Sequence, residues 1–206
     1  MRCAHCCFAC TDVGEDMSLK TFTKACDLAE DGGEYISIGG GEPTIHPKFW
    51  QMVGIAQGRT PEGPIWLATN GKNKKEALRL ANIARHGILS VCLSLDVYHE
   101  PIDPEVSKAF ERPKKTAFNY GQSDNDFREI RDVSGNIKKC GRAVELPEAT
   151  EGCRCDELFV VPNGDVFKCG CLTHKIGNVF DKHISSSLYM LEHRGHHYEE
   201  EEEKDE

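Results

Sequence analysis

The sequence has no long hydrophobic run, and this absence excludes one class of protein at once. The chain has 206 residues, of which 39% are hydrophobic, and no apolar stretch approaches the ~18–20 residues that a bilayer-spanning helix needs. We therefore expect no membrane partner. The first residues also lack a basic region followed by an apolar stretch and a cleavage site, so no secretory leader is visible and a cytoplasmic location is expected.

A concentration of positive charge is missing as well. The net charge is −9, and without a strongly basic face a nucleic-acid partner is not expected. Residues 199–206 hold seven acids and one lysine, and such a block repels itself. We expect residues 185–206 to form a tail that ends in a disordered acidic run. The glycines at 39–41 are not followed by G-K-[ST], which excludes a phosphate loop of that type.

Cysteine, by contrast, is abundant, with 11 residues in the chain. Three of these are scattered, and the other eight form one group near each end of the sequence: Cys3, Cys6, Cys7 and Cys10, then Cys153, Cys155, Cys169 and Cys171. Because cytosolic thiols are kept reduced, these groups favour metal ligation or catalysis over disulfide bonds. The two groups predict two separate metal sites.

The middle of the chain predicts strands that alternate with helices. Apolar periodicity predicts helices over 18–30, 48–57 and 74–87, and strands over 34–39, 64–71 and 88–96. This order predicts an α/β fold with a parallel sheet. Beyond residue 96 we expect short helical turns at 105–110 and 126–132, and a hairpin over 157–171 that turns at Asn163 and Gly164. A boundary near residue 140 would divide one domain, 1–139, from a smaller region, 140–184.

Ligands of open α/β and barrel folds gather at the carboxyl ends of parallel strands. Each predicted strand ends in glycine or polar residues, and these are the candidate cofactor-binding residues: Gly40, Gly41, Glu42, Pro43, Asn70, Ser94 and Asp96. Two of them have other interpretations. Asn70 precedes Gly71 and could serve only as a turn residue, and Asp96 could cap a helix. We expect surface or structural roles for His46 and His99 beside them.

The cysteines at 3–10 and these strand ends together resemble the radical S-adenosylmethionine (radical SAM) superfamily, over about residues 2–100. That family uses a CxxxCxxC triplet to hold a [4Fe–4S] cluster, whose fourth iron binds SAM, and its GGEP motif matches residues 40–43. The resemblance implies that the glycines approach the methionine part of SAM, that Glu42 helps to hold its amino group, and that Ser94 and Asp96 contact its ribose or carboxylate. It also implies a partial (β/α) barrel, here apparently truncated at strand one.

Two sets of cluster ligands are compatible with the motif. Cys3, Cys7 and Cys10 have the family's spacing, but Ala9 stands where the family usually has an aromatic residue or His. The stretch "MRCAHC" instead matches the end of a longer motif, with His5 in the expected place and Cys3 and Cys6 as the second and third ligands. The first ligand would then precede Met1, which we expect to be an internal methionine; if Met1 is the start, Cys7 or Cys10 replaces the missing ligand. Zinc is the alternative occupant.

Residues 140–184 resemble the auxiliary-cluster domains called SPASM or, when shortened, Twitch. Cys153, Gly164 and Cys169 match the signature C-x(9–15)-G-x4-C, and residues 141–143 and 176–180 are also familiar in that context. No cysteine follows Cys171, so the resemblance implies a shortened, cysteine-rich hairpin with at most one auxiliary site. Four thiolates suit either an iron–sulfur cluster or zinc.

The resemblance implies an enzyme that reductively cleaves SAM at a [4Fe–4S] cluster to a 5′-deoxyadenosyl radical, with electrons from an external one-electron donor. Because SPASM and Twitch relatives often modify peptides or proteins, we expect a substrate of that kind; no catalytic residue is assigned. Two alternatives stay open. One is an interaction module that binds zinc or a cluster and never cleaves SAM, and the other is a degenerate family member that binds SAM without turnover.

Overall fold

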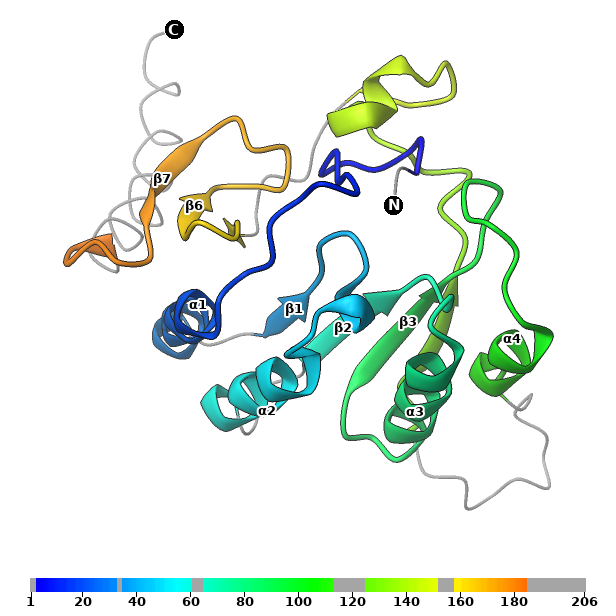
Figure 1. The fold of residues 1–206 in the computed structure, drawn as a ribbon. Coiled ribbons are helices and arrows are strands. Elements are labelled where there is room, and N and C mark those ends of the chain that lie inside the picture. The colour runs from blue at the N-terminus through cyan, green and yellow to red at the C-terminus, as the bar shows by residue number, and fades with distance from the viewer. Residues whose placement is uncertain (1–2, 33–34, 61–64, 113–124, 152–157, 185–206) are drawn as a thin grey trace, which may run out of the picture.

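The larger of two sheets has four parallel strands, as the alternation of strands and helices predicts. The computed structural model describes residues 3–32, 35–60, 65–112, 125–151 and 158–184. Its parallel strands pair in chain order: β1 (Ile36–Ile38), β2 (Ile65–Thr69), β3 (Ser90–Ser94) and β4 (Arg128–Arg131). The connecting helices lie along one face of this sheet (Figure 1): α2 (Phe49–Arg59), α3 (Lys74–Arg85) and α4 (Pro104–Phe110). This is a mixed α/β architecture consistent with a partial (β/α) fold.

Buried and less buried residues alternate along the strands, so the two faces of this sheet differ. In β2, Ile65, Leu67 and Thr69 are buried while the residues between them are half-buried. Leu67 packs into the core that the helices share with Val91 and Leu93 of β3. The opposite face of the sheet is more polar, because the register aligns Ser94 of β3 with Arg131 of β4. The sheet therefore has an apolar face under the helices and a polar face turned away from them.

The prediction of a helical turn at 126–132 is wrong, because this segment contains β4. The two apolar residues of the segment, Phe127 and Ile130, are exposed, and the side chain that points into the protein is Arg128, which is only 7% exposed. Its guanidinium donates to both carboxylate oxygens of Asp126, at 2.9 and 2.6 Å, and to the carbonyl oxygen of Ala109 in α4. The predicted turn at 105–110 is confirmed as α4.

The smaller sheet is antiparallel and has the order β5 (Phe159–Val160), β6 (Asp165–Phe167) and β7 (Lys175–Asn178). β5 and β6 are joined across Asn163 and Gly164, and the φ of +89° at Gly164 is a conformation that glycine adopts without strain. The sequence did not predict β7. The cysteine-rich hairpin as a whole stays a prediction, since Cys153 and Cys155 lie outside the described residues, as does the tail 185–206.

Helix α1 (Leu19–Gly32) packs against both sheets. Phe22 and Cys26 belong to the core of the larger sheet, whereas Leu28 packs with Val166 and Val179 of the smaller one. Figure 1 shows α1 between β1 and the β6–β7 pair. Among the described residues, no helix is long and apolar enough to cross a membrane.

Candidate functional site

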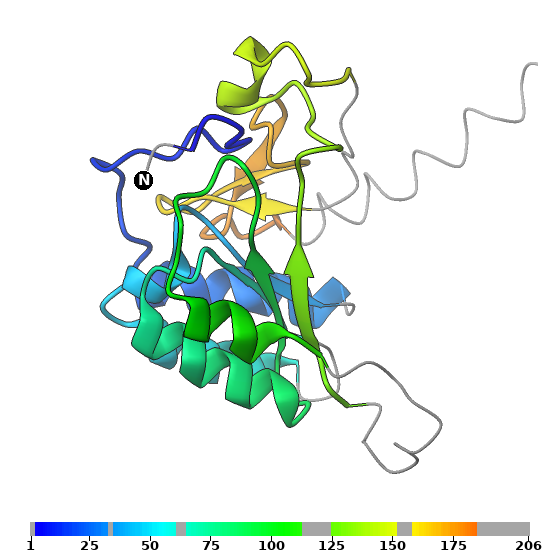
Figure 2. The same cartoon turned by 90° about the vertical axis from the view of Figure 1, so that its right-hand side faces the viewer.

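The cysteine-bearing N-terminal loop, residues 3–10, lies beyond the carboxyl ends of the parallel strands. Figures 1 and 2 place it on the same side of the sheet as the 3-10 helix η2 (Gly141–Glu145). The backbone of this loop turns sharply, since Ala9 has a φ of +50° although it is not glycine. Residues that are far apart in the sequence thus meet above the strand ends.

Ring contacts of two side chains, Phe8 and His5, attach the N-terminal loop to the rest of the protein. The ring of Phe8 stacks on that of Phe159 with a centroid distance of 4.5 Å, so the loop is attached to the smaller sheet. The ring of His5 lies 4.9 Å from the rings of both Tyr98 and His99, in the turn after β3. The smaller sheet and the larger one therefore both support this loop.

The four thiols of the N-terminal loop are half-buried and form no disulfide. A hydrogen bond from the Cys10 thiol lowers the pKa of Cys6 and raises that of Cys10, and the backbone N–H of Cys10 also donates to Cys6 Sγ at 3.4 Å. Burial raises the pKa of the Cys7 thiol to about 12 and also raises that of Cys3. The structure thus favours Cys6 as the thiolate of the metal-free loop; both predicted ligand sets stay open.

The glycine-rich end of β1 adjoins this loop. A Cβ built on Gly41 would lie 3.7 Å from Cys10 Cβ, whereas a Cβ on Gly40 would meet no atom within 4 Å. Gly40 has a φ of +120°, which favours glycine. An exposed backbone without side chains beside a cysteine loop leaves room for a small molecule to approach both.

Glu42 turns its carboxylate into the protein. Oε1 accepts hydrogen bonds from the Thr44 hydroxyl at 2.6 Å and the Thr69 hydroxyl at 2.8 Å, and Oε2 accepts one from the Asn70 N–H at 2.8 Å. Glu42 is the N-cap residue of the 3-10 helix η1 (Pro43–Ile45), and its carboxylate also accepts a hydrogen bond from the Thr44 N–H. Glu42 itself is 7% exposed, and Pro43 and Thr44 are buried as well. Glu42 therefore joins the ends of β1 and β2, and its role toward SAM stays a prediction.

Asn70 and Gly71 form the turn that the sequence offered as one interpretation. The Asn70 side chain accepts a hydrogen bond from the Lys72 N–H at 2.9 Å. Gly71 has a φ of +71°, and a Cβ there would lie 2.8 Å from Leu93 Cδ1. The turn thus requires glycine, and Asn70 is 4% exposed beneath it.

The end of β3 carries a polar group in contact with the loop. Asp96 accepts a hydrogen bond from the His99 ring at 2.8 Å through Oδ1, while its buried Oδ2 has no partner among the described residues. His5 Nδ1 is likewise buried and without a hydrogen bond in the described part of the chain. One ligand atom each from His5, Asp96 and His99 lies within 4.8 Å of the others. Ser94, the last residue of β3 and two positions before Asp96, is buried with 8% of its surface exposed.

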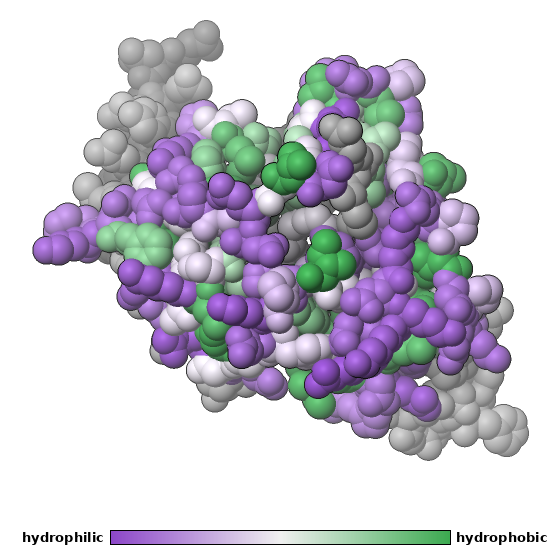
Figure 3. All heavy atoms as spheres, viewed as in Figure 1, coloured by the Kyte–Doolittle hydropathy of each residue, from purple (hydrophilic) through white to green (hydrophobic). Residues whose placement is uncertain are grey.

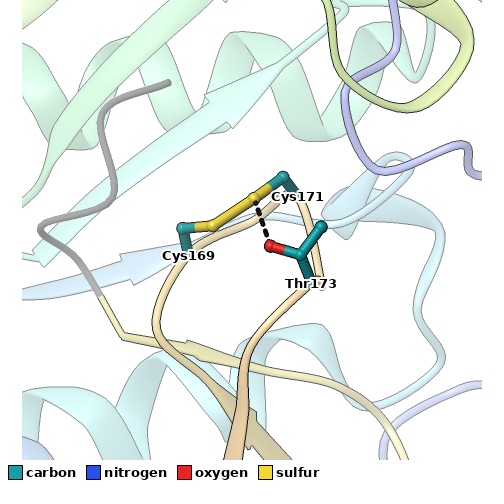
Figure 4. Close-up of a disulfide and its surroundings, with 3 residues drawn as sticks. All are labelled: Cys169, Cys171 and Thr173. Atoms are coloured by element: carbon teal, nitrogen blue, oxygen red, sulfur yellow. Dashed lines mark hydrogen bonds between the residues drawn. A yellow bond between two sulfur atoms is a disulfide. The ribbon is translucent and has the colours of Figure 1, made fainter. Parts of the chain in front are cut away.

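The described C-terminal cysteines differ from the expectation of free thiols. Cys169 and Cys171 form a disulfide in the loop after β6, and the Thr173 hydroxyl lies 3.3 Å from the Cys171 sulfur (Figure 4). The sequence favoured thiolates here because it predicted a reducing compartment. A disulfide provides no thiolate, so metal binding by these two residues would require the bond to be reduced.

Hydrophobic side chains are scattered over the face of the protein in Figure 3, which is mostly hydrophilic. Among the described residues, the three most exposed large hydrophobic side chains are Val13, Val97 and Ile45, which are 85%, 79% and 68% exposed. They lie in the segment after the N-terminal loop, in the turn after β3 and in η1. Ile45 and Val97 thus add apolar surface to the segments that follow β1 and β3.

Sequence reasoning missed two contributions to this site. Arg142 donates hydrogen bonds to the N-terminal loop, and Cys140 lies against Cys7, although both come from the segment before the smaller sheet. His99, expected to be a surface or structural residue, contacts His5. The only signal was the familiar Gly-Arg-Ala at 141–143, which carried no assigned role.

Comparisons with known proteins identify a similar fold among solved structures but assign no family. No family model and no curated protein match the chain. Among solved structures, BtrN in complex with AdoMet and 2-DOIA matches with a TM-score of 0.61 and 17% identity, over 95% of this chain and 84% of that one. An open conformation of BtrN matches with a TM-score of 0.53 and 17% identity, over 92% of this chain and 74% of that one. The chain therefore has the fold of BtrN.

Proposed function

We propose that this protein is a radical SAM enzyme that binds SAM between the cysteine-bearing loop and the glycine-rich end of β1. The observation that carries the proposal is the position of Gly41 beside Cys10 at the carboxyl edge of a parallel sheet, where a Cβ built on Gly41 would lie 3.7 Å from Cys10 Cβ. BtrN, which shares the fold, was crystallised with AdoMet, and this supports a SAM site on the same fold here. The arrangement matches the general rule that ligands bind at the carboxyl ends of parallel strands.

The residues present fit an iron–sulfur cluster. Cysteine thiolates are the usual ligands of such clusters, and the N-terminal loop offers four thiols, of which Cys6 already has a lowered pKa. A [4Fe–4S] cluster, when bound, supplies one electron for the reductive cleavage of SAM to methionine and a 5′-deoxyadenosyl radical. The chain's own residues would hold SAM. The backbone at Gly40 and Gly41 would border its methionine part, and Asp96 Oδ2, which has no hydrogen-bond partner among the described residues, could accept a hydrogen bond from its ribose.

The test is anaerobic reconstitution with iron and sulfide, followed by addition of dithionite and SAM. We expect brown protein that releases 5′-deoxyadenosine. Cys3 belongs to both predicted ligand sets, so Cys3→Ala should abolish release, while Cys26→Ala, on the buried side of α1, should not. Colourless protein that holds only zinc would establish the interaction module instead, and a cluster without 5′-deoxyadenosine would establish the degenerate member.

We propose a peptide or protein substrate, on the basis of the SPASM-like or Twitch-like cysteine pattern at 153–171. A small-molecule substrate is the second candidate, because BtrN holds 2-DOIA together with AdoMet. The two are distinguished by adding either a peptide fraction or a small-molecule fraction of a cell extract to the reconstituted enzyme. The fraction that contains the substrate should increase 5′-deoxyadenosine release, and an external one-electron donor should be required in both cases.

A further inference from the structure

Arg142 binds the backbone of the N-terminal loop although 139 positions of the sequence separate it from Cys3. Its side-chain Nε donates to the carbonyl oxygen of Cys3 at 3.0 Å, and its backbone N–H donates to that of Cys6 at 3.1 Å. One residue therefore fixes the carbonyl groups of two cysteines that stand three positions apart. Because a metal-binding loop must bring its thiolates together, the backbone positions of these cysteines decide whether it is ready to bind.

Gly141 is what allows Arg142 to come this close. Its φ is +55°, and a Cβ at this position would lie 2.3 Å from the Cys7 carbonyl oxygen and 2.5 Å from that of Cys6. Any other residue would push the two segments apart. The contact is thus a property of the pair Gly141–Arg142 and not of a long, adaptable side chain alone.

Part of the Arg142 guanidinium remains without a partner. Nη2 is buried and makes no hydrogen bond within the described residues. A buried charged donor that stays unsatisfied destabilises a protein by more than a neutral one, so such a group marks a place where a further acceptor belongs. Because Arg142 lies against the backbone of Cys3 and Cys6, a sulfur atom of this loop or of what the loop binds is a candidate acceptor.

We propose that Arg142 is a positioning residue for the N-terminal metal site, which fixes the backbone of Cys3 and Cys6 and donates Nη2–H to a sulfur of the bound iron–sulfur cluster. The cluster part of this inference rests on the proposed function. A hydrogen bond to a cluster sulfur, and a positive charge beside it, stabilise the more negative reduced state. Arg142 should therefore raise the reduction potential of the cluster.

The first experiment uses the metal-free full-length chain, so it does not depend on the proposed function. We compare the rate at which iodoacetamide labels Cys7 in the wild type, Arg142→Gln, Gly141→Ala and, as a control, Arg85→Gln at the exposed end of α3. Loss of the hydrogen bonds to the loop should increase labelling about tenfold in the first two variants and leave the control unchanged. Equal rates in all four proteins would overturn the positioning role.

The second experiment measures the reduction potential of the reconstituted cluster by redox titration followed by electron paramagnetic resonance. Arg142→Gln should lower the potential, and Arg142→Lys, which keeps the charge but loses the planar fork, should lower it less. A potential equal to that of Arg85→Gln would overturn the hydrogen bond to sulfur. If the wild type takes up no cluster, the proposed function and the cluster part of this inference fail together, and the labelling result still decides the positioning role.

Discussion

Both carboxylate oxygens of Glu42 accept hydrogen bonds from the protein itself. The donors are Thr44, Thr69 and Asn70, which belong to the segments that follow two different strands. The motif residue therefore organises the edge of the sheet before any ligand arrives. Within the described residues Oε2 accepts a hydrogen bond from the Asn70 N–H and retains a lone pair, which is what the amino group of SAM would need.

Replacing Glu42 with Ala should lower the free energy of unfolding by about 2–4 kcal/mol, because buried donors lose their acceptor. It should also weaken SAM binding to the reconstituted protein. Glu42→Gln, which keeps Oε1, should lose less stability than Glu42→Ala. Urea unfolding and calorimetry measure the two effects, with Glu15→Ala, exposed in the segment before α1, as the control. A Glu42→Ala protein as stable as the wild type would contradict the organising role.

An ion pair between Arg128 and Asp126 stabilises the charged strand β4 against the protein. Arg128 is held by Asp126 and by the carbonyl oxygen of Ala109, so it connects the strand to α4. The Arg128 guanidinium lowers the pKa of Asp126, and the pair is largely buried, with side-chain exposures of 7% and 17%. The last parallel strand thus depends on an electrostatic contact as well as on its backbone pairing.

Asp126→Asn should lower the free energy of unfolding at neutral pH by about 3 kcal/mol, since it leaves Arg128 buried without its counter-charge. The folded pKa of Asp126 is depressed, so this stabilisation is present above the unfolded value of about 3.9 and is lost as the pH falls through the folded pKa. The difference between wild type and variant should therefore shrink as the pH falls below the unfolded value and through the lower, folded pKa of Asp126. Urea unfolding over a series of pH values from neutral to acidic measures it; a difference independent of pH would contradict the assignment.

The sequence predicted most helices and strands of the larger sheet, because apolar periodicity reports which residues face a core. The strand predicted at 88–96 is β3, and the helix predicted at 74–87 is α3. Periodicity could not find β4, whose inward residue is a charged arginine paired two positions away. It also missed β7, a four-residue strand that contains one apolar residue, Ile176.

At the scale of the molecule, the N-terminal loop contacts segments that lie far apart in the sequence. His5 contacts the turn after β3, Cys10 adjoins Gly41, Phe8 stacks on Phe159, and Arg142 binds the backbone. Motif reasoning identified the strand ends near this loop because ligand sites recur at that edge. It could not identify Arg142 or Phe159, because a contact between distant segments produces no repeating pattern of residues in the sequence.

Phe8→Ala should detach the loop from the smaller sheet, since the Phe8 ring stacks on Phe159 and its Cε1 would lie 2.4 Å from a Cβ at Gly170. For a half-buried aromatic pair we expect a loss of about 1–2 kcal/mol and faster proteolysis of the loop. Val13→Ala, which changes an 85% exposed residue shortly after the loop, is the matched control. Limited proteolysis with mass spectrometry measures the change, and equal cleavage of both variants would show that the stacking does not hold the loop.

Helix α1 begins at Leu19, a short segment after the cysteine-bearing loop, and it contributes Phe22 to one hydrophobic core and Leu28 to the other. Neither sheet can separate from this helix without exposing apolar surface that belongs to its neighbour. The two sheets should therefore open as a single cooperative unit, with similar hydrogen-exchange protection at the slowest amides of β2 and β6. A ligand that orders the loop ahead of α1 would then slow the opening of the entire protein, including strands that it never touches.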